Sequence, residues 1–302
     1  MIRAVDHISF TINKGETLGL VGESGCGKTT TANLILRLIE PTSGSIIFEG
    51  NDISHEKENT LKEFRRKTGA VFQDSLASFD PRKNIMHVVS EPLVVHGWHD
   101  KQERTKRVLE LLEQVGLRRE DARKYPHQFS GGQRQRIGVA RALALTPSLV
   151  VADEAVSALD VSVQAKIINL FLEIQKKFNL TFLFISHDLS VLRHISDKII
   201  VMYLGRIVES GSVRDIFENP KHPYTNALLS AIPIPNATLM KRKVYYSLKG
   251  EVPSPINPPS GCGFRTRCPY AQAKCREIEP VLEETNGGHY VSCHYWNEIS
   301  VP

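Results

Sequence analysis

A glycine-rich loop between an apolar strand and a helix constrains the fold of this chain more than any other feature. Residues Gly22–Thr29 read GESGCGKT, which matches the phosphate-binding pattern G-x-x-x-x-G-K-[ST]. The preceding Thr17–Val21 predict a strand, and Thr29–Ile39 predict a helix closed by Pro41. This order places backbone N–H groups at a helix N-terminus, where they can bind phosphate. The chain is therefore predicted to bind a nucleotide through this loop.

The side chains of this loop have distinct expected roles. Lys28 is expected to reach the terminal phosphates, and the hydroxyl of Thr29 is expected to hold Mg²⁺. Cys26 is interpreted as a small loop residue rather than a catalytic thiol. The predicted nucleotide-binding residues of this segment are Gly22, Glu23, Ser24, Gly25, Cys26, Gly27, Lys28, Thr29 and Thr30.

Further apolar strands alternate with helices along the chain. Leu149–Ala152 and Thr181–Ile185 are continuous apolar runs, and a helix is predicted around Val163–Phe178 between them. Strands that are apolar throughout and alternate with helices indicate a parallel sheet covered on both faces. An α/β fold is therefore predicted.

Other elements follow from shorter patterns. The sequence predicts a half-buried strand from the alternation at Ile8–Ile12, a short strand at Ser45–Phe48 and a strand end at Ala70–Gln73. Between Gln73 and Ser130 a helical insertion is expected, with helical spacing over Lys101–Val115. A hairpin is predicted over Lys198–Val208, with Gly205 at its turn.

An adjacent pair of carboxylates, Asp153 and Glu154, ends the Leu149–Ala152 strand. Alone, an acidic pair at this position would be interpreted as a solvated turn. Together with the upstream phosphate loop, it predicts one site, in which Asp153 acts on the magnesium shell and Glu154 polarises or deprotonates the attacking water.

A second anion-binding element lies at Phe129–Gln133, which reads FSGGQ. Ser130 is predicted to cap a helix over Arg134–Leu145, and the glycines leave backbone N–H groups accessible to a γ-phosphate. One nucleotide does not need two phosphate cradles from one chain. The second cradle is therefore expected to serve a nucleotide held mainly by another subunit.

Two further polar residues follow strands. Gln73 could join the magnesium shell, or be a surface amide. His187 could contact a terminal phosphate and orient water, although a lone histidine is more often structural. Their order relative to the other motifs favours the functional interpretation.

Composition limits the class of protein. The chain has 302 residues and a net charge of +5 that is spread along its length, so nucleic-acid binding is not predicted. The longest apolar run, Ile199–Leu204, is far shorter than the roughly 20 residues needed to cross a bilayer, and no secretory segment is recognised at the N-terminus. A cytoplasmic location is expected.

Together these motifs resemble the nucleotide-binding subunit of an ATP-binding cassette (ABC) transporter. The resemblance implies a P-loop ATPase core with a parallel sheet, an antiparallel β subdomain and a helical signature subdomain at about 74–145, all within residues 1–230. It implies catalytic roles for Lys28, Glu154 and His187. It also implies Mg²⁺ at Thr29, Gln73 and Asp153, and a head-to-tail dimer that sandwiches two ATP molecules. The signature segment that faces the partner's nucleotide would be Ser130, Gly131, Gly132 and Gln133.

Three longer segments narrow the resemblance to the ATPases of dipeptide and oligopeptide importers: Val71–Arg82, Lys221–Thr225 and Gly250–Pro255. This narrower resemblance implies three kinds of partner: a second, nonidentical ATPase subunit, two membrane permeases and an extracytoplasmic peptide-binding protein. It also implies a peripheral position on the cytoplasmic face of the membrane. The segment after Gln73 would contact a permease. Two alternatives remain: a soluble cassette ATPase acting on nucleic acid or ribosomes, and a transporter for another small cargo such as a metal chelate.

The chain departs from the family pattern at two places. Members of the family commonly stack the adenine base on an aromatic residue about two dozen residues before the phosphate loop, but no aromatic residue precedes Phe10 here. Either the start of the chain is truncated or the adenine is held otherwise, so no base-stacking residue is assigned. Ala155 stands where the family often has proline. Because both carboxylates before it remain, hydrolysis is expected to survive.

Residues 231–302 are predicted to form a proline-rich extension that carries a four-cysteine site. Cys262, Cys268, Cys275 and Cys293 lie here, and such clustering without an export signal favours metal over disulfides. Zinc usually prefers cysteine pairs two to four residues apart, which this spacing lacks. Some peptide-importer ATPases carry a [4Fe-4S] cluster on a similar tail, so the resemblance favours a cluster. Zn²⁺ and a metal-free tail remain alternatives, as does a docking or sensing role for the tail.

Overall fold

The computed structural model describes residues 3–232 and 250–299 of the chain. The chain divides into two compact units. The first unit comprises Met1–Thr11, Thr17–Thr31 and Ser186–Pro302, and the second comprises Ile12–Glu16 and Ala32–Ile185. Among the described residues, no helix combines the length and the apolar character that a membrane span requires.

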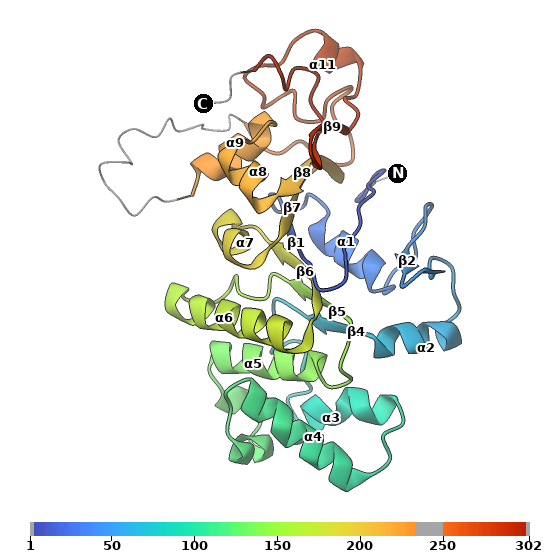
Figure 1. The fold of residues 1–302 in the computed structure, drawn as a ribbon, viewed down its shortest axis with the longest axis vertical. Coiled ribbons are helices and arrows are strands. Elements are labelled where there is room, and N and C mark those ends of the chain that lie inside the picture. Colours follow the sequence, from blue (N-terminus) through green and yellow to red (C-terminus); the bar gives the residue numbers. More distant parts are fainter. Residues whose placement is uncertain (1–2, 233–249, 300–302) are drawn as a thin grey trace. The chain divides into compact units, whose positions relative to one another are not determined.

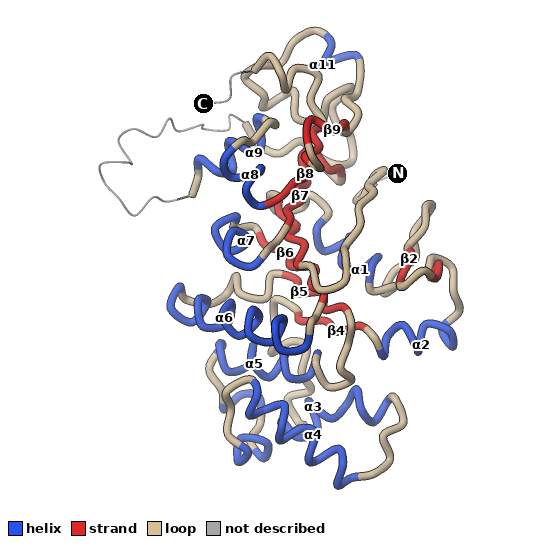
Figure 2. The backbone as a smooth tube through the Cα atoms, viewed as in Figure 1, coloured by secondary structure: helices blue, strands red, loops and turns tan. Residues whose placement is uncertain are grey.

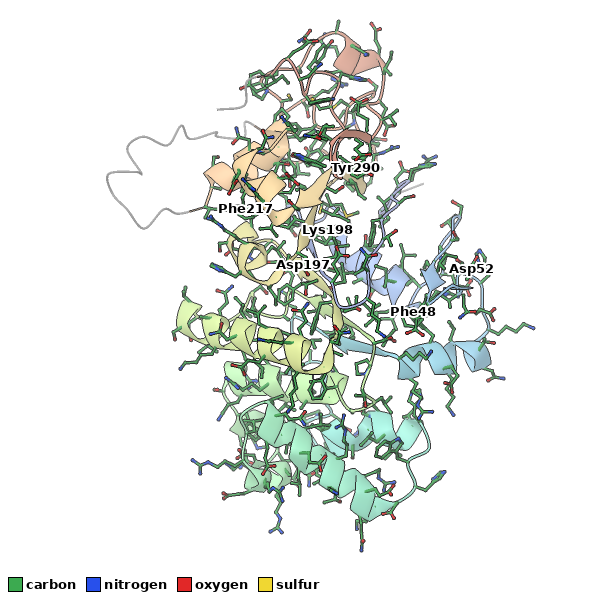
Figure 3. All side chains as sticks on the ribbon, viewed as in Figure 1. Phe48, Asp52, Asp197, Lys198, Phe217 and Tyr290 are labelled. Atoms are coloured by element: carbon green, nitrogen blue, oxygen red, sulfur yellow. The ribbon has the colours of Figure 1, made fainter. Side chains whose placement is uncertain are left out.

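The first unit is built on a mixed sheet in the order β1-β7-β8-β10-β9. β1 runs parallel to β7, whereas the pairs β7–β8, β8–β10 and β10–β9 are antiparallel. The N–H of Thr17 donates to the carboxylate of Asp197 at 2.8 Å, which ties the start of β1 to the residue before β7 (Figure 3). The strands are β1 (Thr17–Val21), β7 (Lys198–Tyr203), β8 (Arg206–Ser212), β9 (Glu283–Asn286) and β10 (His289–Val291).

Short helices complete the first unit. α1 begins in it, directly after the glycine loop, and the C-terminal extension consists mostly of loop (Figure 2). Ser212 and His222 each accept a backbone N–H at the start of a helix, α8 and α9 respectively. The helices are α1 (Lys28–Ile35), α7 (Leu189–Ile195), α8 (Val213–Glu218), α9 (Pro223–Ser230) and α11 (Lys274–Glu277).

The second unit contains a parallel sheet in the order β4-β5-β6, as the sequence predicts. β5 (Leu149–Asp153) and β6 (Thr181–Ser186) are buried along their whole length, and β4 (Thr68–Val71) pairs with β5. Helix α6 (Val161–Phe178) buries one apolar face. Its Phe171 ring meets the rings of Phe182 and Phe184 edge-on, at centroid distances of 5.6 and 5.4 Å. These contacts pack α6 on the parallel strands.

Helices fill the segment between β4 and β5. α3 (Ile85–Val95), α4 (Lys101–Gln114) and α5 (Gly131–Ala142) pack against one another, and α5 also packs on α6 (Figure 1). Asn84 and Asp100 cap the first two of these helices through their side chains. Two short 3-10 helices, at Arg119–Arg123 and Pro126–Gln128, lead into α5.

A separate antiparallel pair, β2 (Ile47–Phe48) and β3 (Asn51–Asp52), lies with helix α2 (Glu58–Arg66) in the second unit (Figure 3). The rings of Phe48 and Phe64 meet edge-on at 4.9 Å, in a small apolar cluster that includes Ile53 and Leu61. This element is the antiparallel component that the family resemblance implies.

Two sequence predictions need correction. Ile8–Ile12 forms no strand, although Ile8, Phe10 and Ile12 are half-buried and the residues between them are exposed. Alternation sets which side chains are buried, but a strand also needs a hydrogen-bonded neighbour. α1 ends at Ile35 instead of continuing to Ile39, because Arg37 adopts a left-handed backbone (φ +53°) and its guanidinium turns inward to the carbonyl of Ile53 at 2.7 Å.

The C-terminal extension holds two strands that the sequence analysis did not predict. β10 pairs with β8 and β9 pairs with β10, so the extension adds to the sheet of the first unit. Gly287 and Gly288, both with positive φ, form the turn between them. The Asn286-Gly287 dipeptide is a hairpin signal that could have revealed this element. Of the predicted proline-rich strap from Pro233, residues 233–249 lie outside the described residues.

Candidate nucleotide-binding site

The phosphate loop joins β1 to α1 in the first unit, and close backbone packing explains its glycines. A Cβ on Gly22 would lie 2.2 Å from the carbonyl oxygen of Met202, and a Cβ on Gly27 would lie 2.3 Å from that of Ala4. Gly27 also has φ +105°, which side chains rarely adopt. Glycine at both positions lets the loop lie directly on neighbouring backbone.

Lys28 begins α1 and is 5% exposed. Its ammonium group donates to the carbonyl of Gly22 at 2.8 Å and to that of Glu23 at 3.2 Å. The lysine therefore folds back over the loop that precedes it. This position suits a cation that meets phosphates bound by the same loop.

Cys26 is buried within the loop, with 1% of its surface exposed. Burial raises the pKa of its thiol, an effect that the nearby Lys28 ammonium opposes. A buried thiol that stays protonated is not a nucleophile. The structure thus agrees with the interpretation of Cys26 as a packing residue.

In the second unit, Gln73 and Asp153 leave the same edge of the parallel sheet. Val71 at the end of β4 is paired with Ala152 in β5, so Gln73 and Asp153 follow neighbouring strand ends. Gln73 is exposed and Asp153 is buried (8% exposed). Carboxylate and amide oxygens are the ligands that Mg²⁺ prefers. The two residues therefore suit the magnesium role predicted for them.

Glu154 has an unusual backbone conformation. Its φ is +49°, and its N–H donates to the carbonyl of Ile185 at 3.0 Å. Its own carbonyl accepts from both the N–H and the hydroxyl of Ser157, at 3.1 and 3.0 Å. Positive φ in a residue other than glycine costs free energy and is concentrated at functional sites. The following Ala155, in place of the family's proline, is buried.

The FSGGQ segment opens α5 as predicted. The hydroxyl of Ser130 accepts from the N–H of Gln133 at 3.4 Å, and the side-chain oxygen of Gln133 accepts from the N–H of Ser130 at 3.0 Å. This reciprocal pair is a capping box. Gly132 is buried, and a Cβ there would lie 2.3 Å from Cγ1 of Val163 in α6. Close packing against α6 therefore explains a glycine at position 132, in addition to the predicted access to backbone N–H groups.

His187 follows β6 directly and is exposed. The residues around it form a tight turn, in which the N–H of Asp188 donates to the hydroxyl of Ser186 at 3.0 Å. The carboxylate of Asp188 then caps α7 by accepting from the N–H of Ser190 at 2.7 Å. This turn fixes the backbone from which the imidazole projects.

The four cysteines of the extension lie in the first unit as free thiols, with Cys275 buried and the other three half-buried. Burial, and to a smaller extent the neighbouring thiols, raises the pKa of Cys268 to about 12 and that of Cys293 to about 11. Within 3–232 and 250–299, however, no three His, Cys, Asp or Glu side chains converge to hold a metal ion. The predicted metal site is therefore not supported by this geometry.

The predicted site residues thus fall into two groups. Gly22–Thr30 and His187 belong to the first unit, whereas Gln73, the FSGGQ segment, Asp153 and Glu154 belong to the second. The sequence analysis missed two contacts to the phosphate loop within the first unit. Tyr224 accepts from the N–H of Glu23 at 2.9 Å, and Arg267 pairs with the carboxylate of Glu23. Tyr224 lies in the predicted Lys221–Thr225 motif, but no local pattern identifies its partner.

The site combines a phosphate loop, an acidic strand end and a capped Ser-Gly-Gly turn in one chain. Known proteins that resemble this chain are consistent with that combination. The ABC transporter family matches residues 5–157, and the C-terminal region of oligopeptide/dipeptide transporters matches residues 208–275. The chain belongs to the ABC transporter family, and it is an ATPase of that family.

Curated relatives extend along nearly the whole chain. The oligopeptide transport ATP-binding protein AppF of Bacillus subtilis (strain 168) is 52% identical over 297 residues, which cover 98% of this chain and 90% of that protein. The dipeptide transport ATP-binding protein DppF of Haemophilus influenzae is 48% identical over 294 residues, covering 97% and 89% respectively.

Solved structures share the cassette fold. The dimeric ATP-binding cassette MJ0796 bound to ADP and Pi superposes with a TM-score of 0.64 at 32% identity, covering 70% of this chain and 91% of that chain. The CbiO1 structure from Clostridium perfringens gives a TM-score of 0.65 at 27% identity, covering 72% and 84%.

Proposed function

We propose that this chain is the ATP-hydrolysing subunit that powers the uptake of dipeptides or oligopeptides through a membrane transporter. The observation that carries the proposal is that the region matched by peptide-transporter C-termini contacts the phosphate loop directly. Tyr224 of that region is fully buried and its hydroxyl accepts from the N–H of Glu23. The names of the AppF and DppF relatives support the same cargo.

The residues of the chain suit hydrolysis of the terminal phosphate of ATP. In this proposal Gly22–Thr30 and Lys28 hold the phosphates, and Glu154 takes the proton of a water molecule as its oxygen attacks the γ-phosphorus. The bond from the γ-phosphorus to the bridging oxygen breaks, and ADP leaves with the electron pair. His187 contacts the γ-phosphate.

Mg²⁺ is the cofactor that this chemistry requires. The donors proposed for it are the hydroxyl of Thr29, the amide oxygen of Gln73 and the carboxylate of Asp153, all hard oxygen ligands. When bound, the ion would neutralise charge that develops on the phosphates.

The second phosphate cradle supports a two-subunit arrangement. Ser130, Gly131, Gly132 and Gln133 would face the nucleotide of a similar but nonidentical ATPase subunit, in a head-to-tail dimer. The pair would sit under two permeases on the cytoplasmic face of the membrane and receive peptide from an extracytoplasmic binding protein. The exposure of Ser130 at the start of α5 is consistent with contact to a partner.

The test is a Glu154→Gln variant in the assembled transporter, scored by ATP hydrolysis and by uptake of labelled peptide. We expect loss of at least about 100-fold in hydrolysis, because a general base contributes on the order of 10²–10⁴-fold. Glu173→Gln, an exposed change on α6, is the matched control and should leave both rates unchanged. Normal hydrolysis by Glu154→Gln would contradict the role of that residue, and absence of permeases from the purified complex would contradict the transporter proposal.

For the extension we propose that Cys262, Cys268, Cys275 and Cys293 bind a [4Fe-4S] cluster, with Zn²⁺ as the alternative occupant. The four cysteines between positions 262 and 293 support this proposal, because four thiolates are the ligand set of a [4Fe-4S] cluster. When bound, the cluster would supply a cross-link between the loops of the extension. Anaerobic purification followed by iron, sulfide and visible-absorption measurements tests it, and a colourless, iron-free protein would rule out the cluster.

A further inference from the structure

A partly buried ion pair connects the extension to the phosphate loop within the first unit. The two terminal nitrogens of Arg267 bind the two carboxylate oxygens of Glu23, at 2.5 and 3.0 Å. The side chain of Arg267 is 5% exposed and that of Glu23 is 28% exposed. A planar, two-bond guanidinium–carboxylate contact is among the stronger hydrogen-bonded pairs in proteins, and it fixes orientation as well as distance. Glu23 is therefore held in one position by a residue 244 positions away.

Aromatic packing holds the same loop from its backbone side. Tyr224, which accepts from the N–H of Glu23, packs against Tyr203 and Phe264 with ring centroids 4.8 and 5.4 Å away. The guanidinium of Arg267 lies 5.9 Å from the centre of the Tyr203 ring. Phe264 and Arg267 come from the extension, and both are buried. The extension thus contributes part of the support on which the loop rests.

The charge of Glu23 gives this contact a role beyond packing. Glu23 lies inside the loop that is proposed to bind the phosphates, so its carboxylate would repel ATP if it were left uncompensated. Arg267 provides one positive charge at hydrogen-bond distance and screens that carboxylate from the nucleotide. In a partly buried position such compensation is weakened little by salt.

We propose that Arg267 is a positioning residue for ATP binding, which neutralises and fixes Glu23 and so makes the C-terminal extension part of the nucleotide site. This rests on the proposed role of the loop in phosphate binding. Loss of Arg267 would leave the half-buried carboxylate of Glu23 uncompensated within the phosphate loop, whereas loss of both charges would remove the conflict. Arg267 is therefore needed because Glu23 is present.

The test compares the assembled transporter with Arg267→Met, Glu23→Gln and the double variant, measuring KM for MgATP and kcat. Arg267→Met should raise KM about tenfold or more, in line with the cost of leaving one member of a buried charge pair. Glu23→Gln completes the mutant cycle, and the double variant should have a KM at least about threefold below that of Arg267→Met, because it removes both charges. A change confined to KM, with kcat within about twofold, is expected of lost ground-state binding.

Matched controls separate this role from folding. Arg265→Met removes a nearby arginine whose Nε donates to the carbonyl of Ser260, and it should leave KM unchanged. Thermal unfolding of each full-length variant shows whether the protein is folded, and Arg267→Lys, which keeps the charge, should show an intermediate KM. A double variant no better than Arg267→Met would overturn the proposal in favour of a structural role, and so would a KM for Arg267→Met within twofold of the parent. Lys28→Ala tests the loop itself: normal ATP binding by that variant would contradict the proposed function instead.

Discussion

The two proposed phosphate cradles of this chain both place glycines at the start of a helix, but the glycines are held in different ways. In the phosphate loop the glycines at Gly22 and Gly27 lie against other backbone carbonyls, and Lys28 is buried. In the FSGGQ turn, Ser130 is exposed, and its side chain and that of Gln133 satisfy each other's backbone N–H groups. The first cradle is shaped by contacts with neighbouring backbone, whereas the second is proposed to present a capped helix start to the nucleotide of a partner subunit. A helix N-terminus therefore does not by itself say which nucleotide it serves.

The largest effect on ATP binding is expected from a substitution in the phosphate loop. Gly22→Ala would place a methyl group 2.2 Å from the carbonyl oxygen of Met202, so the loop must shift and ATP binding should fall at least about 100-fold, which corresponds to roughly 2.7 kcal/mol. Gly25→Ala is the control, because nothing lies within 4 Å of its Cβ position, although its positive φ (+79°) makes alanine unfavourable by about 1 kcal/mol. Equilibrium binding of MgATP distinguishes the two variants. Equal losses would show that backbone crowding at Gly22 is not what shapes the loop.

An intermediate effect concerns the second cradle. Gly132→Ala would place a Cβ 2.3 Å from Cγ1 of Val163, and overpacking of this kind costs about 1–3 kcal/mol of stability. Adding Val163→Ala should recover most of that loss, because the contact is with a side chain. Chemical denaturation measures both variants, and no recovery in the pair would show that Gly132 is needed for its backbone rather than for packing. Neither change should alter binding of ATP by the first cradle.

The smallest expected effect is a pH dependence that only the first cradle should show. Burial lowers the pKa of His222 to about 4, and the negative charge of Glu209 opposes this shift. The carboxylate of Glu209 accepts from the backbone N–H of His222 at 3.0 Å. Neutral Nδ1 of His222 accepts from the N–H of Tyr224 at 3.1 Å, and protonation would end that bond.

The sign of the pH effect follows from that lowered pKa. The unfolded chain takes up a proton near pH 6.5 and the folded chain only near pH 4, so the contribution of His222 is complete above pH 6.5 and is lost as the pH falls towards 4. Thermal melts and MgATP binding between pH 7 and 4 should show Tyr224 releasing the loop. His222→Asn, which keeps a capping acceptor, should remove that part of the pH dependence. An unchanged profile in this variant would assign the dependence to another group.

The comparison also shows which parts of the molecule local sequence patterns predict. β1, β5 and the Ser130 cap were predicted correctly, because strand hydrophobicity and helix capping act over a few neighbouring residues. The pairing of Arg267 with Glu23 could not be predicted, since neither residue carries a local signal for its distant partner. At Ile8–Ile12 the pattern gave burial correctly but not a strand, because pairing depends on what lies alongside. Local patterns thus predicted the phosphate loop but not the contacts that Tyr224 and Arg267 make with it.

The pairing of β10 with β8 has a consequence for shortened forms of this protein. β8 has β7 on one side and β10 on the other, so a chain cut before Glu283 would expose a row of unpaired N–H and C=O groups along β8. Such an open edge recruits strands from other molecules and promotes aggregation. Among the residues that the structure describes, the outermost strand is instead β9, where Glu283 and Glu284 are exposed, and charge on an edge strand discourages such pairing. We therefore expect a shortened form to self-associate more readily than the full chain.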